Sequence, residues 1–226
     1  MLENIPSYIA IVFGITTLLT VYIFSLAARN SKWATTILLG WLILQSVLSL
    51  RGFYTFTNSI PPRFALLVLP PLLFIISLFI FPAGKKFIDG LDAKILTYLH
   101  TVRIPVEFVL YLLFIHKQLP KLMTFEGRNF DILSGISAPF IAYFGYNKMK
   151  LSKSALLIWN FICLALLVNV VVNGFLSAPF PFQQFGFDQP NVAVLYFPFT
   201  WLPGCVIQLV LLSHLASIRQ LLIDKK

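Results

Sequence analysis

The chain has 226 residues, of which 58% are hydrophobic and 11% are charged, against about 25% charged residues in a typical soluble domain. A soluble protein of this length could not bury so much apolar surface, so lipid must solvate much of it. No basic face or stacking module typical of nucleic-acid binding accompanies the net charge of +9, and we interpret this charge as contact with anionic lipid headgroups.

The N-terminal stretch predicts a transmembrane helix rather than a cleavable signal peptide. The leader MLENIPS has Glu3 and no basic residue, and the apolar run after it is longer than the central region of a signal peptide. Basic residues follow the run instead of preceding it. This order is typical of a first helix that inserts with its N-terminus outside.

Windows of about 20 residues predict seven segments long enough to cross the roughly 30 Å of bilayer hydrocarbon. We therefore expect an all-α integral membrane protein with a single polytopic domain over residues 1–226. The fifth segment is short and contains Gly135 and Pro139, so we expect it to begin in the preceding loop or to be broken. The seven predicted spans are 7–28, 33–50, 63–81, 94–116, 131–146, 154–177 and 192–218.

The basic residues between the spans predict the orientation of the chain. Cytoplasmic loops are enriched in Lys and Arg, and one set of connections holds eleven of the 17 basic residues while the other set holds five. We therefore expect an N-terminus outside and a cytoplasmic C-terminus. The short loops favour the inner (plasma) membrane of a bacterium. The eleven residues are Arg29, Lys32, Lys85, Lys86, Lys94, Lys148, Lys150, Lys153, Arg219, Lys225 and Lys226.

A weak internal similarity raises the alternative of duplication. Residues 31–52 align with 152–174 with one gap, and 65–71 align with 193–199. Duplication would give a parallel three-plus-one-plus-three layout, which resembles the plan of the SWEET sugar transporters and of PnuC-type vitamin transporters. The proline–glutamine motif of the SWEET relatives is absent, so membership is not inferred. Apolar segments align easily, and chance similarity stays an alternative.

Two other seven-helix classes are excluded by their residue requirements. A retinal protein needs a lysine in the last span, and 192–218 has none. Membrane zinc hydrolases need several histidines at one depth, whereas only His100 and His214 could meet that condition. Cys163 and Cys205 lack clustered spacing, so we expect small core residues rather than a disulfide or a metal pair. No metal site is predicted, and the cofactor is unknown.

The fourth predicted span has a polar stripe. At about 100° per residue, His100, Arg103, Glu107, Tyr111 and Gln118 share one arc, and the opposite face is apolar. The stripe must therefore face other helices or a water-filled cavity. Arg103 and Glu107 lie one turn apart near mid-span, where a charge costs about 2.5–3.5 kcal/mol. We expect them to pair, because opposite charges at i, i+4 attract.

Pro105 predicts a break in this span. It has no N–H, so the carbonyl of Thr101 loses its helical partner and a polar notch opens beside the charges. Prolines in the third span (Pro70, Pro71) and the seventh (Pro198 and Pro203, with Gly204) add to the interpretation of a binding site at the membrane midplane. The alternative is a structural Arg–Glu clamp. We favour a site, since buried ion pairs often add little net stability.

A second polar cluster precedes the fifth span. Residues 121–135 mix charged and apolar side chains, which is typical of a re-entrant or lid-like segment over the bundle mouth, with a simple surface loop as the alternative. We expect Asn129 or Asp131 to cap the following helix. The candidate ligand-binding residues are Arg103, Glu107, His100, Tyr111, Glu126, Arg128, Asn129 and Asp131.

Two polar pairs elsewhere are expected to join helices. These are Asn169 with Asn173 in the sixth span, and Trp41 with Gln45 in the second. Amide and indole groups within a bilayer are usually satisfied across a helix interface.

Three functions fit these patterns. The favoured one is binding or transport of a small molecule, anionic or amphipathic, at the stripe. An intramembrane enzyme acting on a lipid or apolar substrate would use Glu107 or Glu126 with His100 or His116 as acid–base groups. The third is a membrane scaffold. No GxSxG, HExxH or paired-aspartate motif is present, so catalytic residues stay unknown. The expected partners are the lipid bilayer and a small-molecule or lipid ligand, without nucleic acid.

Overall fold

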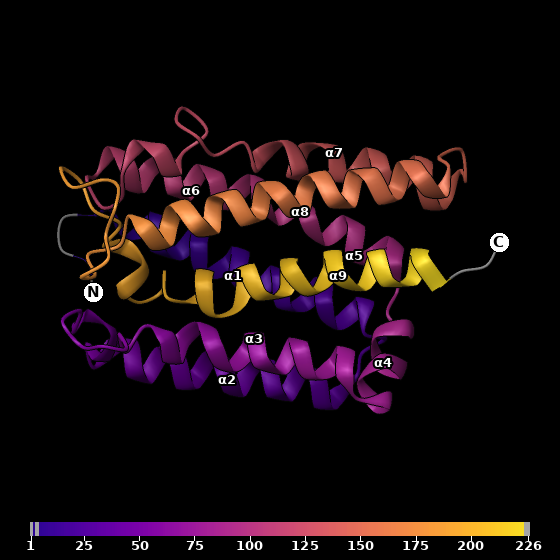
Figure 1. The fold of residues 1–226 in the computed structure, drawn as a ribbon, viewed down its shortest axis with the longest axis horizontal. Coiled ribbons are helices and arrows are strands. Elements are labelled where there is room, and N and C mark those ends of the chain that lie inside the picture. The colour runs from indigo at the N-terminus through magenta and orange to yellow at the C-terminus, as the bar shows by residue number, and fades with distance from the viewer. Residues whose placement is uncertain (1, 3–4, 224–226) are drawn as a thin grey trace.

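The computed structural model describes residues 2 and 5–223, and over these residues the protein is helical and without strands. The long helices lie side by side along the longest axis of the molecule (Figure 1). Except at their ends, helices satisfy their backbone hydrogen bonds within one segment, as a hydrocarbon environment demands. The predicted all-α class is therefore confirmed. The helices are α1 (Ser7–Ala27), α2 (Lys32–Leu50), α3 (Ala65–Ile80), α4 (Pro82–Asp89), α5 (Ala93–Leu99), α6 (Arg103–Ile115), α7 (Ile132–Ala142), α8 (Lys153–Leu176) and α9 (Ile207–Ile223).

Six short turns complete the secondary structure of the described residues. Four are 3₁₀ turns, and the two that adjoin α7 and α9 are π-helical. They are η1 (Phe53–Thr55), η2 (His100–Val102), η3 (Lys121–Met123), η4 (Tyr143–Asn147), η5 (Ala193–Leu195) and η6 (Leu202–Val206).

Five helical segments in the described part of the chain are long and apolar enough to cross a membrane. A sixth would form if α3 and α4 were one span, but their axes differ by 93°. The membrane class is thus supported by length and composition, while the seven-span count remains a prediction. The five are Ser7–Ala27, Lys32–Leu50, Ala93–Ile115, Lys153–Leu176 and Leu202–Ile223.

Two predicted spans differ from the membrane-length helices of the structure. The seventh predicted span, 192–218, begins about ten residues too early, because its helix starts at Leu202 and extends to Ile223. Pro198 cannot donate a helical hydrogen bond. The residues before it are apolar because they are buried within the protein, and they do not form part of a membrane-spanning helix. The fifth, 131–146, is α7 continued by η4, and it is not among the five membrane-length helices.

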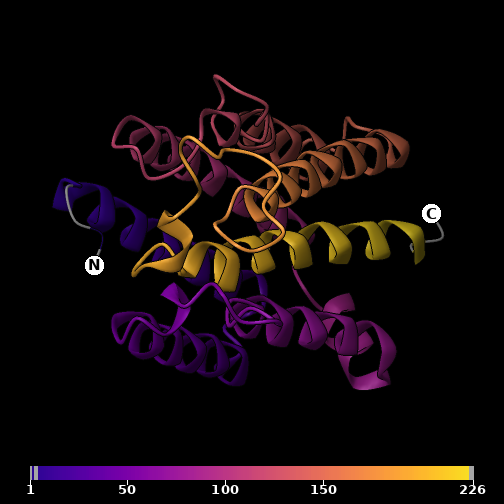
Figure 2. The same ribbon diagram turned by 60° about the vertical axis from the view of Figure 1, so that its left-hand side comes forward.

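α9 occupies the centre of the bundle. Both views show it between a layer formed by α2 and α3 and a layer formed by α6, α7 and α8 (Figures 1 and 2). It packs against α1, α3, α5 and α8, and more of its residues are buried than of any other helix described. The described chain begins and ends at opposite ends of the bundle (Figure 1).

Two indole groups join α2 to the start of α9. Trp41 Nε1 donates to the carbonyl of Gly204 at 2.8 Å, and Trp201 Nε1 donates to the carbonyl of Leu42 at 3.2 Å. Gln45 Oε1 accepts from the hydroxyl of Tyr54, whose pKa burial raises to about 12, so the hydroxyl stays protonated. The predicted contact with another helical element is confirmed for Trp41, whereas Gln45 binds the turn that follows its own helix.

Candidate functional site

The break that Pro105 predicts is limited to one 3₁₀ turn, since Ala93–Ile115 is a single helical segment. Helix α5 ends at Leu99, the 3₁₀ turn η2 follows, and α6 begins at Arg103. The side chain of Asp92 caps α5 by accepting from the N–H of Ile95 at 3.0 Å. Because a 3₁₀ turn is tighter than an α-helix, it changes the register of the side chains that follow it. Arg103 thereby lies at the first position of a new helix.

Arg103 links four helices and is only 3% exposed. Its Nη1 donates to Asp131 Oδ1 at 2.9 Å, and its Nη2 lies 2.9 Å from His214 Nε2. The same Nη1 is 3.4 Å from the carbonyl oxygen of Cys163. The guanidinium of α6 is therefore bound to the start of α7, to α8 and to α9.

The predicted pairing of Arg103 with Glu107 is wrong, since the guanidinium forms its ion pair with Asp131. Close packing of α7 on α6 explains the difference. A Cβ atom at Gly135 would lie 2.9 Å from Ile104 Cγ1 and 3.3 Å from Arg103 Cβ, so glycine permits this approach. It also brings Asp131, just before α7, within reach of the guanidinium.

His214 connects Arg103 to a second group of polar and aromatic side chains. Its Nδ1 lies 2.9 Å from Asn160 Oδ1. The amide oxygen only accepts, so Nδ1 donates and Nε2 accepts from Arg103. The ring of His100 stacks on His214 with centroids 3.9 Å apart, and Trp159 packs against both rings. The contacts thus fix one neutral tautomer of His214.

Glu107 has a different partner from the one predicted. Its carboxylate oxygens lie 2.7 and 2.8 Å from Asn129 Nδ2, and the side chain is 1% exposed. Asn129 also donates to the carbonyl of Met123 at 3.0 Å and accepts from the N–H of Asp131 at 3.0 Å. Asn129 therefore fixes the segment before α7 onto α6.

Part of the segment from Lys121 to Asp131 is buried in the bundle, so it is not a simple surface loop, and its lid-like role stays a prediction. Thr124 and Asn129 are almost fully buried. The chain doubles back so closely that a Cβ atom at Gly127 would lie 2.2 Å from the Lys121 carbonyl oxygen. Asp131 lies at the N-cap of α7 as predicted, but its side chain makes no capping hydrogen bond; it binds Arg103 instead.

A cavity of about 310 Å³ lies beside these groups. Its polar side chains include Arg103, Glu107, Asp131 and Gln208, and most other lining residues are apolar. Gln208 donates to the carbonyl of Pro203 at 3.0 Å, while its Oε1 has no partner among the described residues. The π-helical turn η6 forms part of the wall, and such turns are frequent at functional sites.

Five of the predicted site residues do not line the cavity; besides His100 and Asn129, described above, these are Tyr111, Glu126 and Arg128. Tyr111 stacks on Phe125 with ring centroids 4.9 Å apart. Glu126 and Arg128 are exposed, and Glu126 lies 3.8 Å from Lys121 Nζ.

Gln118 also leaves the predicted stripe, because α6 ends at Ile115. The carbonyl oxygen of Gln118 instead accepts from the N–H groups of Val192 and Ala193, both at 3.1 Å. Asn169 donates to the Arg128 carbonyl at 2.8 Å, so it joins α8 to the segment before α7 and not to another helix, while Asn173 donates to Asn169 within α8 at 3.1 Å.

Three residues that bind Arg103 directly, bind it through His214, or line the cavity were not among the predicted site residues. His214 attracts notice in the sequence only because its depth matches that of His100. Asn160 and Gln208 are single amides in apolar helices, and that isolation is the only signal they give. Their grouping depends on how α8 and α9 pack, which no local pattern specifies.

The described residues contain no group of three or more His, Cys, Asp or Glu side chains arranged to hold a metal ion. Cys163 and Cys205 are both free and buried, as expected for small core residues.

One family model matches this chain. It is described as a domain of unknown function, DUF8737, and it covers residues 60–222. The matched region contains α3 to α8, most of α9 and every residue that lines the cavity beside Glu107. No curated protein and no solved structure matches the chain.

Proposed function

The chain belongs to the DUF8737 family, and from the geometry of its cavity we propose that it binds a small amphipathic molecule beside Glu107 and transports it across the membrane. The observation that carries this proposal is the cavity itself. Its volume of about 310 Å³ is within the roughly 300–1,000 Å³ of small-molecule sites. Apolar walls with a few polar groups are typical of such sites.

The polar groups of the cavity have separate roles in this proposal. Arg103 is already bound to Asp131 and His214, so it holds the cavity wall together. Glu107 has Asn129 as its partner, and a carboxylate has capacity for further hydrogen bonds. Gln208 offers a free amide oxygen. Two acceptors favour a ligand whose polar end donates hydrogen bonds, such as a hydroxyl or an amine, over an anion.

We also propose seven membrane crossings, with the N-terminus outside. α3 and α7 with η4 would supply the two crossings beyond the five long helices. The described chain begins and ends at opposite ends of the bundle (Figure 1), which supports an odd number of crossings. The excess of basic residues on one set of connections supports a cytoplasmic C-terminus. The short connections favour the inner membrane of a bacterium.

Mass spectrometry of compounds that co-purify with the protein tests the binding proposal. We expect the wild type to retain one small amphipathic compound, and Glu107→Gln and Val170→Phe to lose it. Glutamine keeps an oxygen for Asn129, so the loop contact persists, and phenylalanine at Val170 fills the cavity. Phe108→Ala is the matched control, because Phe108 is on α6 but 53% exposed. Equal retention by all four proteins would contradict the proposal.

A further inference from the structure

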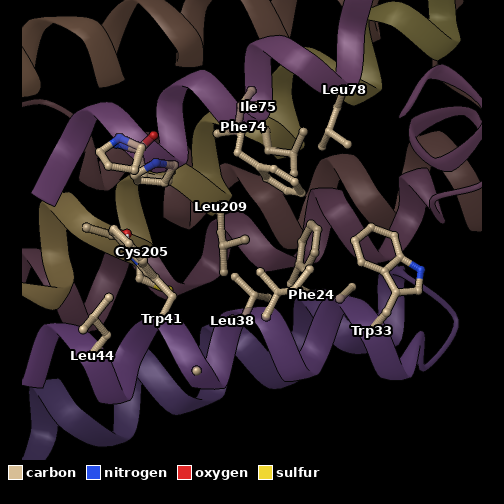
Figure 3. A pocket seen from close by; sticks show the side chains of 18 of the residues that line it. Phe24, Trp33, Leu38, Trp41, Leu44, Phe74, Ile75, Leu78, Cys205 and Leu209 are labelled. Carbon is tan, nitrogen blue, oxygen red and sulfur yellow. The ribbon is translucent and has the colours of Figure 1, made fainter. Parts of the chain in front are cut away.

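A second cavity, an apolar groove of about 330 Å³, lies between α2, α3 and α9. Figure 3 shows apolar side chains from the three helices facing it, among them Leu38, Phe74 and Leu209. Gln208 lines both this groove and the cavity beside Glu107, so the two spaces share this residue in their walls. The lining is almost entirely apolar.

The length of the groove corresponds to one leaflet of a bilayer. The residues that α2 contributes run from Trp33 to Leu44. At about 1.5 Å per residue they span about 17 Å, roughly half of the 30 Å hydrocarbon thickness. An extended acyl chain that enters from one membrane surface would therefore fill it.

One end of the groove is basic. The rings of Trp33 and Phe87 lie 4.7 Å apart at this end, and both line the groove. Lys32 precedes Trp33, and Lys85 and Lys86 precede Phe87. α4, which contains Phe87, turns 93° away from α3 and so lies across the end of the bundle (Figure 1). Among the described residues, none of these three lysines forms an ion pair.

From the charge and the length of this groove, we propose that it binds one acyl chain of an anionic phospholipid, with the lipid phosphate at Lys32, Lys85 and Lys86. The apolar lining excludes water and packs against the chain. The lysines attract the negative headgroup, and Trp33, at the same end of the groove, is of a residue type enriched at membrane interfaces. This site does not depend on the ligand proposed at Glu107.

Native mass spectrometry in detergent tests the charge preference. Phosphatidylglycerol and phosphatidylcholine with the same acyl chains are the probes. We expect the wild type to retain one phosphatidylglycerol molecule, with at least tenfold preference over phosphatidylcholine. Lys85→Gln with Lys86→Gln should reduce that preference to within twofold. The matched control, Lys148→Gln with Lys150→Gln, removes two exposed lysines from the same end of the bundle and should leave it unchanged.

Blocking the groove tests where the chain lies. A Cβ atom at Gly40 would meet nothing within 4 Å, so Gly40→Phe fills the groove without a backbone clash. We expect it to lower the retention of both lipids at least tenfold, with Leu44→Trp as a second blocking variant. The proposal would be overturned if the wild type retained both lipids equally, or if retention were unchanged in both blocked variants. A protein dimer without bound lipid would also overturn it.

Discussion

At the scale of single residues, Arg103 and Asp131 form a buried ion pair whose members depend on each other. Removing one partner leaves an uncompensated buried charge, which costs about 3–5 kcal/mol, whereas replacing both with apolar residues is often neutral. We expect Arg103→Leu and Asp131→Leu each to lower the unfolding temperature in detergent. The double variant should have an unfolding temperature close to that of the wild type.

The control for this cycle is Arg219→Leu with Asp89→Leu, a partly exposed pair at 2.8 Å. Exposed pairs contribute about 0–1 kcal/mol, so its single variants should differ little from the wild type. Additive losses in the Arg103 and Asp131 cycle would show that the two residues act independently.

The sequence indicates which residues are buried here but not which residues they contact. Helical spacing correctly assigned His100, Arg103 and Glu107 to one buried face. The i, i+4 rule describes neighbours on a helix surface. It fails for Arg103 because the guanidinium binds Asp131, which lies 28 residues further along the chain. Long-range partners of this kind depend on helix packing, so local spacing does not contain them.

At the scale of elements, the segment from Lys121 to Asp131 depends on the backbone at Gly127. A side chain there would collide with the Lys121 carbonyl and with Leu122 Cα, which is 2.6 Å from the Cβ position. We expect Gly127→Ala to displace Asn129 from Glu107 and to increase hydrogen exchange over residues 121–131. Gly40→Ala is the control, since an added Cβ there meets open space. Unchanged exchange in Gly127→Ala would contradict this account.

Hydropathy predicted the long helices well and the interrupted ones poorly. The first and second predicted spans agree with α1 and α2 to within about one residue, because each is a continuous apolar run. The seventh is misplaced at its start because a buried apolar loop and a spanning helix have the same composition. The 93° turn after α3 had no signal apart from Pro82 and the lysines that follow it.

At the scale of the whole molecule, seven crossings predict the side of each connection. We expect an impermeant maleimide to label Asn58→Cys and Arg128→Cys in intact cells. Lys86→Cys and Lys150→Cys should react only after lysis. The native cysteines are buried and give a low background. Labelling of Lys150→Cys in intact cells would show that α7 and η4 do not cross, and the same result for Lys86→Cys would exclude α3 as a crossing.

Composition alone was sufficient for the membrane class, because no soluble core could contain so many apolar side chains. The cavity beside Glu107 could not be predicted from the composition or from the sequence of any one helix. It forms where α6, α8, the π-helical turn η6 and α9 leave space between them, and its polar wall joins residues from Arg103 to Gln208. Only the packed bundle brings these positions together.

Equilibrium binding of the co-purified compound to the wild type and to Glu107→Gln is the most direct test of the central claim. The claim assigns ligand contact to Glu107 and structural support to Arg103. We expect Glu107→Gln to bind the compound at least about tenfold more weakly, a loss of about 1.4 kcal/mol, with an unchanged unfolding temperature. Equal affinity of the two proteins would contradict the claim, and so would weaker binding that appears only together with a lower unfolding temperature.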